Sequence, residues 1–438
     1  MSETARKVYL TGIGPGDFRG MTMQAEEVIT AADCLIGADR MLSCAEAVLS
    51  GDGSEGNGRK ENDREGNDRK ATGHIPRLCV YRPGEICAYI GSHPEYRRIV
   101  VLLSGDTGFY SGAKKLGQAL KERFPDLSVE MIPGISSIVY LAAKLETSWE
   151  DGALVSLHGQ AGDFISTVNR NRKTFLLLGG SQSGKYMTDR LKEFGMDQVI
   201  LHCGTRLSYP DERILSGSLD DLSEEAFSGL STVLIENPRP DRRASSHIRD
   251  EEMIRGNVPM TKEEVRSVSM AKLELTEGAV LWDVGAGTGS VSVEAALSGK
   301  YIRVYAVEKK EEAVDLIRQN RIKFRADGIR IICGEAPEAL RDLEPPTHLF
   351  IGGSSGSMQE ILHIALEKNP DVRIVINAIS LETVGDVMEA VESGMLRDEE
   401  IVQLCVSRSR TLGRYHMMTG QNPVYIISAG GPQEKGTI

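Results

Sequence analysis

The chain carries an apolar run that meets three alternating glycines, Val280-Leu281-Trp282-Asp283-Val284-Gly285-Ala286-Gly287-Thr288-Gly289. A segment of small residues with amphipathic spacing follows directly, at positions 290–296. This order of patterns predicts a buried strand, a tight loop and the start of a helix. Glycine is needed where the backbone takes unusual dihedrals or lets a ligand approach the main chain. The helix N-terminus adds unpaired N–H groups and a partial positive charge.

An acidic residue closes the next expected strand. Residues 303–307 are apolar enough to form that strand, and Glu308 follows them. In open parallel sheets an acid at this place commonly hydrogen-bonds the ribose hydroxyls of a nucleotide. The glycine pattern alone is a weak signal that also fits a merely tight strand–helix turn. Together with the acid, it predicts a ligand that contains a nucleoside.

The length and composition exclude several classes of protein. With 438 residues and 40% hydrophobic content, the chain is expected to form two or three domains with substantial cores. Its formal charge of −12 argues against general nucleic-acid binding, which needs a basic surface. No apolar run approaches the ~20 residues that span a bilayer, and residues 1–7 lack the apolar core of a signal peptide. We therefore expect a cytoplasmic protein with neither a membrane nor a nucleic-acid partner.

The cysteines and histidines do not form a metal-binding pattern. The seven cysteines contain no CxxC pair, and several lie inside apolar runs, as is typical of buried free thiols in a reducing cytoplasm. The histidines are scattered, and His202 beside Cys203 is an isolated pair. The sequence therefore predicts no metal site.

The N-terminal part contains three small-residue loops, each placed after an expected strand. The first, Thr11-Gly12-Ile13-Gly14-Pro15-Gly16-Asp17, differs from a dinucleotide loop because Pro15 removes a backbone donor where a phosphate would need one. The others are Ser104-Gly105-Asp106-Thr107-Gly108-Phe109-Tyr110 and Pro133-Gly134-Ile135-Ser136-Ser137. Each alone fits a simple turn, but open α/β sheets bind ligands where strands end. The three loops predict a binding cleft, completed by a second α/β half over residues 154–238.

Two polar segments divide the chain. Residues 51–70 contain no aliphatic or aromatic side chain, which predicts a disordered surface loop. Residues 237–257 are rich in Pro, Arg, Asp and Glu and are interpreted as a linker. We expect an N-terminal domain over 1–240 with an insertion at 51–72, a linker over 241–257, and a C-terminal domain over 258–438.

The C-terminal domain is expected to open with a helix and to close with two adjacent strands. Thr261 is predicted to cap the helix, with Glu264 completing a capping box. The last two strands, at 401–407 and 424–428, are joined without a convincing helix. A terminal antiparallel pair on a parallel sheet is characteristic of nucleoside-dependent methyltransferases. It fits a nicotinamide dehydrogenase less well.

These motifs resemble those of a known family. Pro259-Met260-Thr261-Lys262, the glycine loop and Asn422-Pro423-Val424 resemble the carbon-15 methylating and decarboxylating domain of cobalamin biosynthesis. The three N-terminal loops, together with Ser156-Leu157-His158-Gly159, resemble the tetrapyrrole methylases of the carbon-5 branch. The chain is similar to the fused precorrin-6Y methyltransferases over almost its whole length. The resemblance implies an α/β fold: a two-lobed tetrapyrrole-methylase domain followed by a Rossmann-like class I methyltransferase domain.

The resemblance also implies a cofactor, S-adenosylmethionine, with one molecule in each domain. Methyl transfer from a sulfonium is an in-line displacement, so the protein mainly has to align donor and acceptor. The implied cofactor contacts in the C-terminal domain are Thr261, Gly285, Ala286, Gly287, Thr288, Gly289, Glu308 and Ala336. In the N-terminal domain they are Pro15, Gly105, Asp106, Thr107, Ser136 and Ser137. No catalytic residue is assigned, because the conjugated macrocycle can itself accept the electrons of decarboxylation.

The implied substrate is a tetrapyrrole with many carboxylates, so local cations must offset the acidic charge of the chain. Candidate cations are Lys262, Arg266, Arg408, Arg410 and Arg414. His348 departs from the family pattern, which often has an acid before the fourth strand of this domain. We expect a homo-oligomer. Two alternatives remain at the level of sequence: a nicotinamide-dependent oxidoreductase and a non-enzymatic nucleoside-sensing protein.

Overall fold

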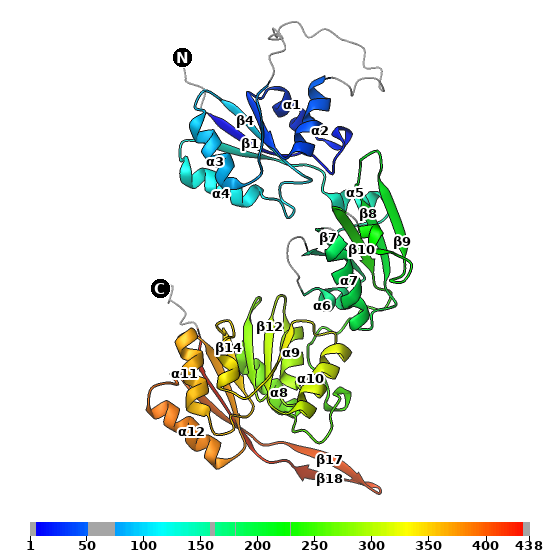
Figure 1. The fold of residues 1–438 in the computed structure, drawn as a ribbon. Helices are drawn as coiled ribbons and strands as arrows, with labels where there is room; N and C mark the ends of the chain where they lie inside the picture. The colour runs from blue at the N-terminus through cyan, green and yellow to red at the C-terminus, as the bar shows by residue number, and fades with distance from the viewer. Residues whose placement is uncertain (1–5, 51–74, 158–162, 180, 228, 432–438) are drawn as a thin grey trace. The chain divides into compact units, whose positions relative to one another are not determined.

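The computed structural model describes residues 6–50, 75–157, 163–179, 181–227 and 229–431 (Figure 1). The predicted disordered loop at 51–70 and the pair His158-Gly159 lie outside the described residues. The chain forms two compact units. One is built from the described residues of Met1–Gly162, Asn171–Thr188 and Gln198–Pro238, and the other from those of Asp163–Arg170, Asp189–Asp197 and Arg239–Ile438.

The first unit opens with a five-stranded parallel sheet of order β3-β2-β4-β1-β5. Its strands are β1 (Lys7–Gly12), β2 (Cys34–Gly37), β3 (Arg77–Cys79), β4 (Arg98–Leu103) and β5 (Ser128–Ile132). Helices α1 (Met23–Thr30) and α2 (Asp39–Ser50) share one core cluster with this sheet, and α3 (Pro83–Ser92) and α4 (Ala113–Arg123) share another. Along β4, Ile99 and Val101 belong to one cluster and Val100 and Leu102 to the other. The sheet is therefore covered on both faces, as its continuous apolar strands require.

A second sheet of order β6-β7-β10-β8-β9 completes this unit. Its strands are β6 (Ala153–Leu157), β7 (Lys173–Leu178), β8 (Ile200–Thr205), β9 (Arg213–Gly217) and β10 (Ser231–Glu236). Only the β6–β7 pair is parallel among these described strands. Helix α5 (Ser137–Lys144) packs Ile138 and Leu141 against Phe175 and Leu234 of this sheet. Helix α7 (Ser181–Glu193) begins in this unit and ends in the second, to which α6 (Ile165–Arg170) belongs.

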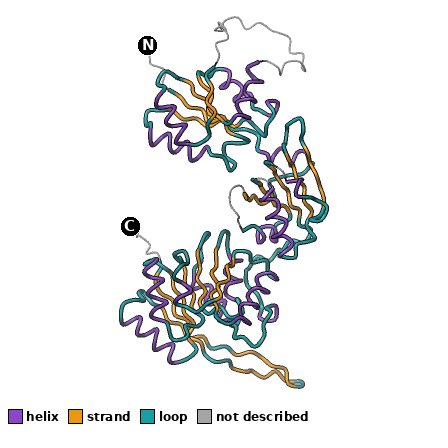
Figure 2. Tube along the Cα trace, viewed as in Figure 1, coloured by secondary structure: helices purple, strands orange, loops and turns teal. Residues whose placement is uncertain are grey.

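The second unit contains a seven-stranded sheet of order β13-β12-β11-β14-β15-β19-β16 (Figure 2). Its strands are β11 (Val280–Val284), β12 (Arg303–Glu308), β13 (Ile329–Cys333), β14 (His348–Ile351), β15 (Arg373–Ala378), β16 (Glu400–Leu404) and β19 (Val424–Gly430). Strands β11 to β15 are parallel, and β19 runs antiparallel to both β15 and β16. The helices are α8 (Glu263–Leu273), α9 (Ser290–Ser298), α10 (Glu311–Lys323), α11 (Met358–Lys368) and α12 (Leu381–Glu392). The predicted strand–loop–helix and the terminal antiparallel pair are confirmed.

Two local predictions in this unit are wrong. The strand expected over 401–407 ends at Leu404, and Ser407 opens a separate hairpin of β17 (Ser407–Leu412) and β18 (Tyr415–Gly420) that projects from the sheet (Figure 1). Neither strand alternates apolar and polar residues, so no sequence pattern predicted the hairpin. Thr261 does not cap α8, since Lys262 occupies the N-cap without a side-chain bond. Glu264, expected in a capping box, instead accepts a hydrogen bond from Arg408 at 2.8 Å.

Candidate functional site

A cavity of about 810 Å³ opens at the carboxyl ends of β11, β12, β14 and β15 in the second unit. Small-molecule sites range over roughly 300–1,000 Å³ and favour this edge of a parallel sheet. Residues 258–262, here named the strap, form one wall, and the loop of Gly285 to Gly287 forms another. Gly285 and Gly287 in the second wall carry no side chain, as expected for a site that recognises its ligand partly by main-chain contacts.

The three glycines of the central loop all require positive φ. Their values are +72° at Gly285, +56° at Gly287 and +76° at Gly289, a region that other residues rarely adopt. Each is also packed closely. A Cβ at Gly287 would lie 2.7 Å from the carbonyl oxygen of Pro259, and one at Gly285 would lie 2.7 Å from that of Gly353. Because these positions are glycine, the strap and the loop after β14 can pack against the main chain of the central loop.

Glu308 fastens the loop from the end of β12. Its Oε2 accepts the N–H of Gly287 at 3.0 Å, while Oε1 accepts those of Lys309 and Lys310 at 2.9 and 3.0 Å. A carboxylate oxygen can accept more than one hydrogen bond, so these contacts leave capacity for ligand hydroxyls. The acid thus both orders the glycine loop and presents an acceptor to the cavity that it lines.

Most of the C-terminal residues predicted from the sequence line this one cavity. They are Thr261, Lys262, Gly285, Ala286, Gly287, Glu308 and Ala336. Thr288 is fully buried and Gly289 is the N-cap of α9, and neither lines the cavity. Their contribution is to the turn that starts the helix.

The sequence predictions missed one side of the cavity. Its lining also includes Val258, Pro259, Met260, Lys309, Lys310, Gly334, Glu335, Gly352, Gly353, Ser354, Ser355, Asn377, Gln421 and Asn422. Their positions could have indicated them, because several of these residues directly follow strands that were predicted correctly. Lys309 pairs with Glu335 at 2.6 Å. In the described part of the chain, Lys262 and Lys310 have no ion-pair partner, so they supply the uncompensated positive charge of this cavity.

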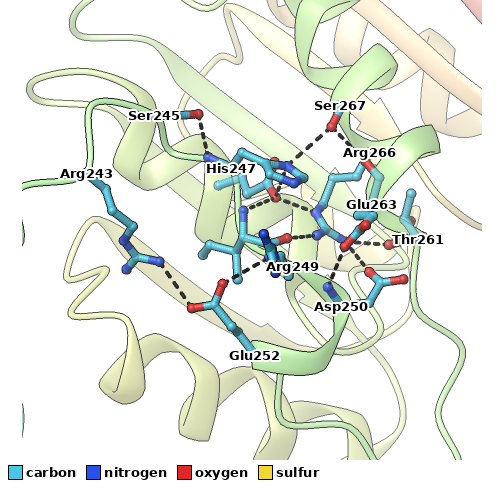
Figure 3. A network of polar contacts seen from close by, with 12 residues as sticks. Arg243, Ser245, His247, Arg249, Asp250, Glu252, Thr261, Glu263, Arg266 and Ser267 are labelled. Atoms are coloured by element: carbon cyan, nitrogen blue, oxygen red, sulfur yellow. Dashed lines mark hydrogen bonds and ion pairs between the residues drawn. The ribbon is translucent and has the colours of Figure 1, made fainter.

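Two of the predicted substrate cations are paired with carboxylates of the protein itself. Arg266 is 0% exposed and does not line the cavity, so its assignment as a substrate contact is wrong (Figure 3). Arg408 pairs with Glu263 and Glu264, both at 2.8 Å, and these carboxylates hold its pKa above the ordinary value. Arg410 and Arg414 lie on or beside the exposed hairpin strands rather than at the cavity.

Two titratable residues lie on the strands below the cavity. His348 is the first residue of β14, at the end opposite the cavity, and its Nδ1 lies 2.8 Å from Thr347 Oγ1. Burial lowers the pKa of His348, so it stays neutral and structural. Asp283 in β11 is 1% exposed and accepts a hydrogen bond from Ser292, and burial raises its pKa to about 7.

A second, smaller cavity of about 310 Å³ lies in the first unit. It is lined by Asp106, Phe109, Gly134, Ile135, Ser136, Ile138, Val139, Trp149 and Leu154. Of the six residues predicted here, Asp106 and Ser136 reach the cavity. Pro15, Gly105, Thr107 and Ser137 do not line it.

Three glycines hold the N-terminal loops together beside this cavity. A Cβ at Gly134 would lie 2.2 Å from the oxygen of Gly105, and one at Gly12 would lie 2.6 Å from the same atom. Asp106 bridges the loops, since Oδ2 accepts the N–H of Gly108 at 2.7 Å and Oδ1 that of Gly134 at 3.2 Å. Ser136 caps α5 by accepting the N–H of Ile138. The loops after β1, β4 and β5 therefore meet at one point, as the sequence predicted.

The described residues contain neither a metal-binding cluster nor a membrane-spanning helix. No three His, Cys, Asp or Glu side chains among them are grouped so that they could hold a metal ion. None of the described helices combines the length and the apolar character needed to cross a bilayer.

Comparisons with known proteins match two parts of the chain to two families. Residues 252–429 match the family model described as a precorrin methyltransferase domain, and residues 7–223 match that of the tetrapyrrole (corrin/porphyrin) methylases. The chain is 47% identical over 175 residues to a probable cobalt-precorrin-6B C(15)-methyltransferase (decarboxylating) of Pyrobaculum calidifontis, covering 39% of this chain and 89% of the relative. The chain belongs to the precorrin methyltransferases.

A second relative of this methyltransferase spans both units. A precorrin-6Y C(5,15)-methyltransferase [decarboxylating] of a Sinorhizobium species is 26% identical over 424 residues, 95% of this chain and 94% of the relative. Among solved structures, a precorrin-6Y C5,15-methyltransferase of Geobacter metallireducens is 36% identical, with a TM-score of 0.40 over 42% of this chain and 97% of that one. The family-model matches confirm the predicted family, and the sheets with their covering helices confirm the α/β fold class.

Proposed function

We propose that this methyltransferase adds methyl groups to carbons 5 and 15 of a corrin precursor and removes the carboxyl group of its ring C acetate. The relative that matches 95% of the chain bears a name that states both methylations and the decarboxylation. The observation that carries the proposal is that each unit has its own cavity, formed by loops that follow parallel strands. Two separate cavities fit two methylations better than one shared site.

The residues of the larger cavity fit S-adenosylmethionine. When bound, this cofactor supplies a methyl group on a positively charged sulfonium. The loop of Gly285 to Gly287 lines the cavity where a nucleoside would lie, and Glu308 offers an acceptor for its ribose hydroxyls. We assign the same cofactor to the smaller cavity, where Asp106 and Ser136 are the polar lining residues beside an apolar wall.

The remaining side of the larger cavity is assigned to the macrocycle. Asn377, Gln421 and Asn422 supply amide groups there, and Lys262 and Lys310 supply positive charge for carboxylates. The strap packs against the glycine loop, so the contribution assigned to the protein is alignment of donor and acceptor. Loss of carbon dioxide leaves an electron pair that the conjugated ring can accept. No side chain is required as a nucleophile.

Product mass tests the proposal directly. The full chain is incubated with S-adenosylmethionine and either the metal-free or the cobalt-containing precursor. We expect the product to have gained two methyl groups and lost one carbon dioxide. An unchanged mass with both macrocycles, with the protein folded, would refute the proposed function.

A further inference from the structure

Arg266 carries a positive charge that the structure buries completely. Its Nε donates to Glu294 Oε1 at 2.7 Å, and its Nη1 donates to Asp250 Oδ1 at 3.2 Å (Figure 3). Both carboxylates are themselves buried, at 2% and 5% exposure. A buried guanidinium is tolerated only when it is paired and hydrogen-bonded, and here both conditions are met.

The same guanidinium also binds two backbone carbonyls. Nη1 donates to the oxygen of Thr261 at 2.6 Å, and Nη2 donates to that of Ile248. Glu294 Oε1 in turn accepts the N–H of Ile248 at 2.9 Å. Arg266 therefore joins three segments: the interdomain segment at 248–250, the strap at Thr261, and helix α9 at Glu294.

One of these segments, the strap, forms a wall of the cofactor cavity, and another, helix α9, directly follows a second wall, the glycine loop. All five residues of the strap line it, and the oxygen of Pro259 would lie 2.7 Å from a Cβ on Gly287. Helix α9 begins at Ser290, immediately after the glycine loop. Arg266 thus connects the strap to the element that carries the glycine loop, although its own side chain does not line the cavity.

We infer that Arg266 is a positioning residue for the cofactor, which sets the spacing between the strap and the glycine loop through the carbonyl of Thr261. The inference rests on the proposed function of this cavity. The planar fork of donors reaches Glu294, Asp250 and both carbonyls from one position, whereas the point charge of a lysine cannot bond all of them. Arg266→Lys keeps the buried charge but loses this spacing.

Binding of S-adenosylhomocysteine to the full chain, measured by calorimetry, tests the inference. For Arg266→Lys we expect affinity at one site to fall about tenfold, while the site in the other unit binds as in the wild type. Carbon dioxide release reports the C-terminal reaction alone. Its KM for S-adenosylmethionine should rise about tenfold, with kcat changing by less than about threefold.

Arg373→Lys is the matched control, because Arg373 at the start of β15 contacts the same helix, α8, that carries Arg266. Arg373 Nε donates to the oxygen of Lys272 at the other end of α8, and its Nη1 donates to that of Gly430 at 3.0 Å. It joins backbone segments as Arg266 does but does not line the cavity. We expect Arg373→Lys to lower the melting temperature without changing cofactor affinity.

The outcomes distinguish a failure of this inference from a failure of the proposed function. Unchanged binding by a folded Arg266→Lys, or equal effects of the two arginine variants, would overturn the positioning role. A wild-type chain that binds no S-adenosylhomocysteine would instead overturn the cofactor assignment. If Arg266→Lys does not fold, Glu294→Gln keeps the shape of the acceptor and should weaken binding several-fold, and unchanged affinity in that variant also refutes the inference.

Discussion

The two cavities of this methyltransferase both depend on glycine, but for different physical reasons. In the C-terminal loop, Gly285, Gly287 and Gly289 all take positive φ. In the N-terminal loops, Gly12 and Gly134 have no such requirement, and each lacks room for a Cβ because the loop of Gly105 packs against it. The first site thus combines a local backbone conformation with contacts to Pro259 and Gly353. At Gly12 and Gly134 of the second site only the contact between distant loops requires glycine, so each site should fail through substitutions at its own glycines.

Gly287→Val should cause the largest loss of activity, and this loss should be confined to the C-terminal site. Its Cβ would lie 2.7 Å from the oxygen of Pro259 at a φ of +56°, so strap and loop must separate. We expect carbon-15 methylation and decarboxylation to fall about a hundredfold or more. Carbon-5 methylation should persist, giving a product with one added methyl and no loss of carbon dioxide. Loss of both methylations in a folded protein would instead point to a single shared site.

Gly134→Ala should produce the reciprocal result. The added Cβ would lie 2.2 Å from the oxygen of Gly105, a backbone atom that cannot move independently. We expect carbon-5 methylation to be lost while decarboxylation continues, and Asp106→Arg should do the same by removing the acceptor that bridges the loops. Gly112→Ala is the control, because nothing lies within 4 Å of its Cβ and its φ is −69°. Equal loss in both alanine variants would show that packing at Gly134 is not the cause.

Truncation tests whether the larger cavity depends on the segment that precedes Arg255. A fragment that begins at Arg255 contains every strand of the second unit but lacks Asp250 and Ile248, leaving Arg266 without two partners. Removing one member of a buried ion pair costs about 3–5 kcal/mol. We expect this fragment to melt well below one that begins at Arg239 and to bind S-adenosylhomocysteine poorly. Equal melting temperatures would show that the interdomain segment is dispensable.

Asp283 should cause a smaller, pH-dependent effect beneath the glycine loop. Its pKa in the folded chain is about 7, against 3.8 for an ordinary aspartate, mainly because of burial. The folded state therefore binds the proton more tightly, and wild-type stability falls as pH rises between these two values. Asp283→Asn does not titrate. The unfolding free energy of Asp283→Asn minus that of the wild type should therefore rise by on the order of 4 kcal/mol from about pH 4 to about pH 8. Parallel stability profiles from chemical denaturation would contradict this.

The sequence predicted the order of strands and the loops that carry the sites. Apolar runs ending in small residues placed β1, β4, β5, β11 and β12 correctly, because burial on both faces makes parallel strands continuous in hydrophobicity. It missed β3, β9 and the β17–β18 hairpin. These strands are short or largely exposed, so little burial imposes a pattern on their residues.

The sequence by itself determined where glycine and acid recur after strands, and this was sufficient to predict a nucleoside site. The two-part methyltransferase was predicted from the resemblance of the motifs to a known family. Only the tertiary structure decided which cations reach the cavity. Lys262 and Arg266 lie four residues apart, and the sequence treats them alike. Lys262 lines the cavity, whereas Arg266 is enclosed by Asp250 and Glu294, 16 positions before it and 28 positions after it. Burial of a charge depends on partners brought together by folding, and no local pattern records them.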